Sequence, residues 1–189
     1  MMNIIWCVML ISGIISAIVS GNAGIIDCSG TEAQIGEIKS LEGIRFLPNL
    51  DTLKCDHNQI SSLDVSRCDR LTKLYCNDNP MTTLKLIDHE RDNEYEKEDD
   101  VDEDDGYEEE YEYRNYKLKE VFCYNCNLTE LDVHNCVCIE YAYIDGEATA
   151  DQNTYTFSEP EDDAILKIDK GVKIITDEWS SRADLESIC

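Results

Sequence analysis

The sequence predicts an α/β-type solenoid, a repeat fold in which short coils of one pattern stack side by side. A pattern of apolar residues that begins at Leu50 returns at Leu71, 21 residues later, and again at Leu118. The apolar positions keep the same spacing in all three copies, so the copies share one register. One coil cannot bury its apolar side alone, and the copies are therefore expected to pack against one another.

Each copy is expected to hold one short strand, in which alternate side chains point in and out. The aligned columns are Leu50, Leu53, Cys55, Asn58, Ile60, Leu63 and Val65, then Leu71, Leu74, Cys76, Asn79, Met81, Leu84 and Leu86, then Leu118, Val121, Cys123, Cys126, Leu128, Leu131 and Val133. An inward asparagine is tolerable only if its amide binds backbone groups of the turns. We therefore expect the asparagine column to hold the turns together.

These columns fit the signature L-x-x-L-x-L-x-x-N/C-x-L, with Asn58, Asn79 and Cys126 at the N/C position. The chain resembles leucine-rich-repeat proteins over about residues 38–146, and the first copy is most similar to secreted and surface repeat proteins of bacteria. The resemblance implies a right-handed solenoid with a parallel sheet on its concave side. It implies no reaction, because one fold carries many functions.

Residues 1–23 are expected to be a secretory signal peptide. The stretch Ile4–Val19 is mostly apolar and uncharged, and Gly21-Asn22-Ala23 fits a small-x-small cleavage site, with Val19-Ser20-Gly21 nearly as suitable. A membrane anchor is the alternative, for which the run is short. We expect a secreted protein that meets a membrane only through this segment, before cleavage.

Residues 24–146 are expected to contain an N-terminal cap and the repeats. Within the cap, Thr31 can begin a short helix that runs toward Lys39. A degenerate first coil is expected from about Ile38. A fourth coil is expected from Ile139, again 21 residues after the start of the preceding copy, with Ile139, Ala142 and Ile144 inward.

Residues 147–189 are expected to form a C-terminal cap. Residues 166–174 alternate in polarity around a glycine, which favours a β-hairpin. Residues 177–188 are expected to form a closing helix.

An acidic insertion separates the second and third copies. Residues 88–113 contain 16 acidic residues against Arg91 and Lys97, which predicts a disordered loop on the convex face or flank. Its Asp100-x-Asp102-x-Asp104 stretch begins like a calcium-binding loop, but Asp105 and Tyr111 replace the required glycine and glutamate. Only weak binding of divalent ions is expected of it.

The formal net charge of −25 excludes nucleic acid as a partner and favours cationic partners or divalent ions. In a eukaryotic secretory pathway, Asn127-Leu128-Thr129 would be a glycosylation acceptor and the tyrosines of the acidic insertion would resemble sulfation sites.

The cysteines imitate a zinc cluster, with His134 near Cys123, Cys126, Cys136 and Cys138. Repeat register explains all of these cysteines except Cys138 as core positions, so no metal site is expected. The off-pattern Cys28, Cys138 and Cys189 are the candidates for a disulfide. His57 and His134 are near cysteines only in sequence and are expected to be solvated, so we expect neither catalysis nor a cofactor.

The outward positions of the strands bring aromatic side chains together, which are enriched where proteins bind ligands. We expect a non-enzymatic binding protein that recognises a protein or glycan through Lys54, Lys73, Tyr75, Phe122, Tyr124, Tyr141 and Tyr143. The simpler interpretation is that the aromatic row only stabilises the sheet. The alternative function is an extracellular acidic protein that binds divalent ions or polycations through residues 88–113.

Overall fold

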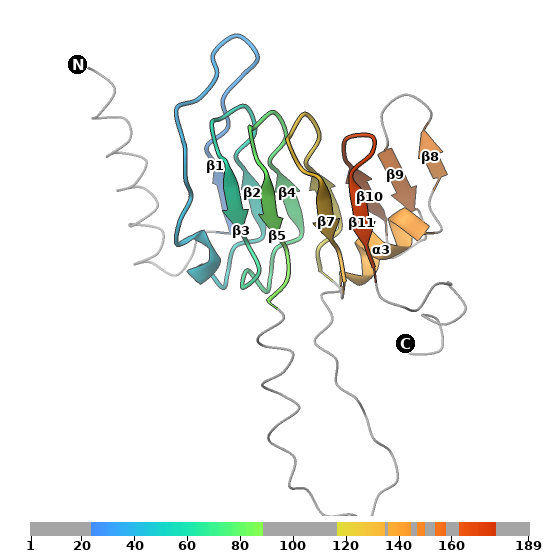
Figure 1. The fold of residues 1–189 in the computed structure, drawn as a ribbon. Helices are drawn as coiled ribbons and strands as arrows, with labels where there is room; N and C mark the ends of the chain where they lie inside the picture. Colours follow the sequence, from blue (N-terminus) through green and yellow to red (C-terminus); the bar gives the residue numbers. More distant parts are fainter. Residues whose placement is uncertain are drawn as a thin grey trace, which may run out of the picture.

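The computed structural model describes residues 24–88, 117–134, 136–144, 147–149, 154–157 and 163–176 (Figure 1). The expected signal segment, residues 89–113 of the acidic insertion and the expected closing helix lie outside these ranges. Among the residues described, no helix is both long enough and apolar enough to cross a bilayer.

A large sheet of seven strands forms one layer of the molecule. Its order is β1 (Ile25–Asp27), β2 (Thr52–Lys54), β4 (Lys73–Tyr75), β6 (Glu120–Phe122), β10 (Ala164–Lys167), β9 (Thr154–Phe157) and β8 (Glu147–Thr149). The first five strands are parallel, whereas β9 and β8 are antiparallel to their neighbours.

A second layer lies in front of the large sheet in Figure 1. Here β3 (Ser62–Asp64) pairs with β5 (Thr83–Lys85), and β7 (Glu130–Asp132) pairs with β11 (Lys173–Ile175), both in parallel. A 3-10 turn, η1 (Ile44–Phe46), precedes β2, and helix α3 (Val137–Ile144) follows β7. Each repeat copy thus gives one strand to the large sheet and the next to the second layer.

The strands pair in the register of the sequence repeat. Leu53 lies opposite Leu74, and Leu74 lies opposite Val121. These inward side chains are fully buried, as are the cysteines two residues after each of them. The apolar core therefore fills the space between the two layers, with one rung from each copy.

Helix α3 replaces the fourth coil that we expected from Ile139, so that prediction is wrong. Ile139 and Ala142 are fully buried, but on a helix that packs against β10 and β9. The small side chains of Cys138, Ala142 and Ala164 form one buried cluster, which lets the helix approach the sheet closely. Inward residues at this spacing fit a helix as well as a coil.

The expected hairpin over residues 166–174 is also wrong. Leu166 lies opposite Val121 in the large sheet, whereas Ile174 lies opposite Leu131 in the second layer. The two strands flank a turn at Gly171, whose φ of 91° is left-handed. This part of the expected C-terminal cap therefore continues both layers. The prediction fails because alternating polarity indicates a strand but does not determine which strand it pairs with.

The N-terminal segment contains a strand where we expected only a cap. Ile26 of β1 lies opposite Leu53, so the pattern begins before Ile38. The helix expected from Thr31 is absent from this described segment; the Thr31 hydroxyl instead accepts a 3.0 Å hydrogen bond from the Gln34 amide in a tight turn. Cys28 thereby falls in the column of Cys55, and its amide donates to the Lys54 carbonyl.

The first residue of the expected loop, Asp88, belongs to the folded part. Its carboxylate is 2% exposed and lies 2.5 Å from Nε of Arg67, 3.5 Å from Nζ of Lys85 and 3.6 Å from Arg45. Burial opposes ionisation, but the hydrogen bond from Arg67 and the positive charges outweigh it and lower the pKa of Asp88. These contacts anchor the chain at Asp88, the last described residue before residue 117.

Candidate functional site: the outer face of the large sheet

The outer face of the large sheet carries the side chains that alternate with the buried rungs. We define the outer face by Lys54, Lys73, Tyr75, Glu120, Phe122 and Lys167 on β2, β4, β6 and β10, together with Tyr124 just beyond β6. All seven side chains are partly exposed. Five of them are residues that the sequence selects as ligand-binding.

Two aromatic rings lie next to each other at the centre of this face. The ring centroids of Tyr75 and Phe122 are 5.1 Å apart and the rings are tilted by 33°. On the far side of Tyr75, Nζ of Lys54 lies 5.6 Å from its ring centroid. This row of a cation and two rings spans three adjacent strands and offers a partly apolar platform.

Glu120 fixes the middle of the platform. One of its oxygens lies 2.5 Å from Nζ of Lys73, and the other accepts a short hydrogen bond from the Tyr75 hydroxyl. Partial burial opposes the charge of Glu120, but the bonds from Lys73 and Tyr75 outweigh it and lower the pKa of Glu120. Burial and then the bond to Glu120 raise the pKa of Tyr75 to about 12. Tyr75 is therefore a neutral, oriented hydroxyl at physiological pH.

Tyr124 forms a second aromatic contact beside the platform. Nζ of Lys167 lies 4.1 Å from the Tyr124 ring centroid, which is well within the range of a cation–π contact. Lys167 was not among the predicted binding residues, because the hairpin prediction placed its strand outside the repeat. The period-two pattern around Leu166 was the signal that could have identified it.

Tyr141 and Tyr143 do not lie on a strand of the large sheet, so their assignment as outward strand positions is wrong. Both lie on α3, which packs against the large sheet rather than pairing with it. The Tyr143 ring packs against the core and meets Tyr155 edge to face at 5.1 Å. The Tyr141 side chain lies outside what the structure describes. The error follows directly from the expected fourth coil.

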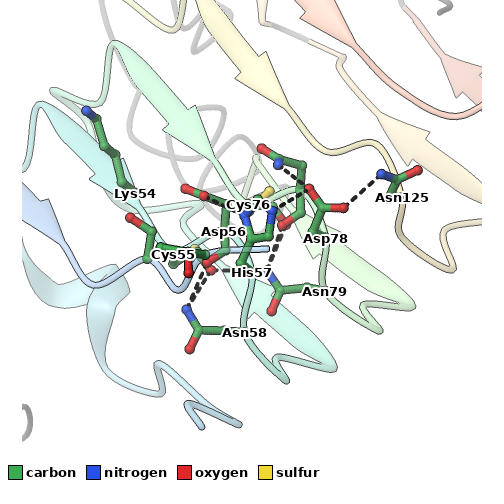
Figure 2. A network of polar contacts seen from close by, with 12 residues as sticks. Lys54, Cys55, Asp56, His57, Asn58, Cys76, Asp78, Asn79 and Asn125 are labelled. Atoms are coloured by element: carbon green, nitrogen blue, oxygen red, sulfur yellow. Dashed lines mark hydrogen bonds and ion pairs between the residues drawn. The ribbon is translucent and has the colours of Figure 1, made fainter. Parts of the chain in front are cut away.

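A polar edge borders the outer face where the strands end (Figure 2). We define it by His57, Asp78 and Asn125, which follow successive strands and share a left-handed backbone with φ of 53°, 55° and 51°. Asp and Asn adopt this conformation more readily than most residues. The three side chains are therefore presented by the same turn in each copy.

His57 lies between two carboxylates on this polar edge (Figure 2). Its Nδ1 is 2.9 Å from Oδ2 of Asp56, and its Nε2 is 3.5 Å from Oδ2 of Asp78. The bond to Asp56 raises the pKa of His57, partial burial opposes this, and the charge of Asp78 adds to the increase. His57 is thus a partly buried side chain in contact with two carboxylates rather than the solvated one that the sequence predicts.

Asn58 and Asn79, which we call the asparagine ladder, bind the backbone of the turns that carry the polar edge. The Asn79 side-chain amide donates to the carbonyls of Cys55, Cys76 and Asn77 at 3.0 to 3.2 Å, and its oxygen accepts the Ile60 amide at 2.9 Å. Asn58 makes the same bonds one copy earlier, to the Cys28, Cys55 and Asp56 carbonyls and from the Ile38 amide. Each asparagine thereby joins its own turn to the preceding one.

The ladder changes chemistry at Cys126. Its thiol lies 3.7 Å from the Cys76 carbonyl and 3.6 Å from that of Tyr124, which are weaker contacts than those of an amide. The carboxylate of Asp169 compensates from the following coil, since it accepts the amides of Asn125 and Cys126 at 2.9 Å each. A charged residue thus closes the ladder at its C-terminal end.

The cysteines of the described region are free thiols. The candidates Cys28 and Cys138 are among them, whereas Cys189 lies outside this region. Burial raises the pKa of Cys55, Cys76 and Cys123 well above the ordinary value. In the described ranges, no three His, Cys, Asp or Glu side chains are arranged to hold a metal ion.

Comparisons of the chain with protein-family models, with curated proteins and with solved structures give no match. Function is therefore argued from the outer face itself.

Proposed function

We propose that this chain is a secreted, non-enzymatic protein of the leucine-rich-repeat type that binds a protein or glycan ligand through the outer face. That face takes the place of the concave sheet face in the solenoid that the sequence resemblance implies. The observation that carries the proposal is the contact between Tyr75 and Phe122, with centroids 5.1 Å apart and both rings partly exposed.

Ligand binding explains the cost of exposing these groups. Rings on a sheet can stabilise each other across strands, but two aromatic side chains that remain open to water leave apolar area unburied. The oriented hydroxyl of Tyr75, the carboxylate of Glu120 and the ammonium of Lys54 add directional polar groups around the rings. Apolar surface with a few placed polar groups is the usual composition of a binding site.

The test compares Y75A/F122A with F46A. Phe46 is 65% exposed on η1, away from the outer face, so F46A is a control for the loss of an aromatic ring that is more exposed than Tyr75 and Phe122. Immobilised wild-type protein is offered to a glycan array and to a panel of purified extracellular proteins. Ligand capture should be lost in Y75A/F122A and retained in F46A, with both variants folded by circular dichroism.

Retained capture by folded Y75A/F122A would contradict the proposal and leave the rings with a structural role only. Deletion of residues 89–113 separates the alternative function, since a polycation- or ion-binding protein that acts through the acidic insertion would lose its ligand. Asp88 is excluded from that deletion because its buried carboxylate is held by Arg67.

A further inference from the structure

Strand β1 is an edge of the large sheet with one side unpaired. It lies at one end of the row of strands and pairs only with β2 among the described strands (Figure 1). The Gly24 carbonyl accepts the Thr52 amide at 2.9 Å, and the Cys28 amide donates to the Lys54 carbonyl at 2.8 Å. Alternate residues of a parallel strand bond to the same neighbour. The backbone N–H and C=O groups of Ile25 and Asp27 are therefore directed away from β2.

Among the described residues, no strand, proline or lysine protects this edge, although β1 is short and carries Asp27. Natural proteins guard such edges with very short strands, charged side chains, proline, bulges or a covering segment. The sequence of β1 is Ile-Ile-Asp, and Ile25 is 68% exposed. The other large apolar side chains exposed in the described region, Ile35 at 62% and Phe46 at 65%, also precede β2. Exposed apolar surface is thus gathered in the segment that begins with β1.

The charge around this edge is negative. Asp27 at the end of β1 and three residues between β1 and η1, namely Glu32, Glu37 and Glu42, are exposed and acidic, against the exposed Lys39 and the partly exposed Lys54 opposite Asp27. Arg45 is engaged elsewhere, since it pairs with Asp64 at 2.6 Å. A second copy of this chain would bring the same acids, and the repulsion of the whole molecule, against the edge. A positively charged segment is the complementary occupant.

We propose that β1 is a docking edge for an extended, basic segment of another protein, which adds to the large sheet as a strand beside β1. The outward N–H and C=O groups of Ile25 and Asp27 would supply the main-chain bonds. A lysine or arginine of the added strand would lie beside the Asp27 carboxylate, and an apolar residue would lie beside Ile25 on the same face. The surface is distinct from the outer-face platform, so its occupancy does not depend on Tyr75 or Phe122.

The probe is a short synthetic peptide that alternates valine and lysine, titrated by calorimetry against the full chain. I25P removes an outward donor and is compatible with an edge strand whose N–H faces solvent, so the β1–β2 pairing should survive. D27K reverses the charge beside the edge, and E130K makes the same reversal on an exposed residue of β7. Binding should weaken about tenfold or more in I25P and D27K and stay within about twofold in E130K.

Two further measurements exclude general attraction to an acidic protein. A peptide of the same composition with a central proline cannot form the ladder and should bind at least about tenfold more weakly. In hydrogen exchange, the amides of Ile25 and Asp27 should exchange fast in the free protein and become protected by the peptide. The Thr52 amide, which is already bonded to Gly24, should stay protected throughout and reports that β1 remains paired in I25P.

The proposal is overturned if wild-type protein does not bind the peptide, or if D27K and E130K weaken binding equally. Slow exchange of the Ile25 amide before peptide is added would also overturn it. That result means that the edge is already covered, by a second copy if the protein elutes as a dimer, or otherwise by another segment of the same chain.

Discussion

His57 Nδ1 lies 2.9 Å from Oδ2 of Asp56 in a turn whose left-handed backbone recurs at Asp78 and Asn125. Because the folded-state pKa of His57 is raised, its pairing stabilises the protein at pH values below the ordinary pKa near 6.5 and loses this effect as the pH rises through the folded-state value. The variant H57N keeps a residue that tolerates the left-handed backbone.

Wild type should therefore gain about 0.5–1 kcal/mol of stability relative to H57N at pH values below 6.5, and this gain should be lost as the pH rises through the folded-state pKa of His57. Urea denaturation of both proteins at a series of pH values measures the difference directly. A constant difference across this range would show that His57 is not charged through its aspartate contacts.

Removal of the Glu120 carboxylate should free the Tyr75 hydroxyl from its hydrogen bond. In E120Q the pKa of Tyr75 should fall from about 12 toward its ordinary value, although burial of the ring will keep it somewhat elevated. A pH titration of the protein with ¹³C-labelled tyrosine, followed by NMR, measures the pKa of Tyr75. Tyr124 is the internal reference, because Glu120 does not contribute to the rise of its pKa. An unchanged Tyr75 titration would contradict the geometry of the platform.

The asparagine ladder should carry a large share of the stability. N79A removes the side-chain bonds to three carbonyls and leaves the Ile60 amide without its acceptor, so it should lower the free energy of unfolding by about 2 kcal/mol. N79C introduces cysteine, the residue that the next copy has at the equivalent position 126. It should lower the free energy of unfolding less than N79A does. Denaturant unfolding of the two variants provides the comparison, and equal losses would show that Cys126 is not a working substitute for asparagine.

Asp88 should be more important to stability than Asp64, although both pair with Arg45. Asp88 is 2% exposed and Asp64 is 32% exposed, so only D88N removes a buried carboxylate, the one on which the partly exposed Arg45, Arg67 and Lys85 converge. We expect a loss of about 2 kcal/mol for D88N and less than about 1 kcal/mol for D64N. Since the pKa of Asp88 is lowered, its contribution should be present near neutral pH and decline as the pH falls through the folded-state pKa.

The thiols of the described residues should react slowly in the native protein. Burial raises the pKa of both half-buried cysteines, Cys28 and Cys126, to about 11, so little thiolate forms at pH 8. Labelling with Ellman's reagent should be slow before unfolding and rapid in denaturant. Rapid labelling of the folded protein would show that the core opens readily or that a reactive cysteine lies outside the described residues.

The strand register and much of the candidate site can be read from the sequence because spacing alone determines them. Leu53, Leu74 and Val121 are 21 or 47 residues apart, and the pattern around them is unchanged by the insertion. The same argument places Tyr75 and Phe122 on adjacent strands. Periodicity fails at Ile139, where a buried face fits either a helix or a coil, and this error misplaces Tyr143.

Long-range electrostatics is the second feature that the sequence does not reveal. Asp88 begins a run of acidic residues, and nothing in its immediate neighbours predicts that Arg67 and Arg45 reach it from earlier turns. His57 is similar, because its pairing with Asp78 depends on the stacking of two turns. Contacts of this kind require the three-dimensional arrangement of the copies.

The acidic insertion lies between β5 and β6 in the sequence, and β4 and β6 nevertheless remain direct neighbours in the sheet with Lys73 opposite Glu120. The chain between Asp88 and Lys117 can therefore change in length without altering the pairing on either side. Closing a longer connection costs only about 0.6 kcal/mol for each doubling of its length. We therefore expect this position to accept the insertion of a reporter or a whole foreign domain while both layers still assemble.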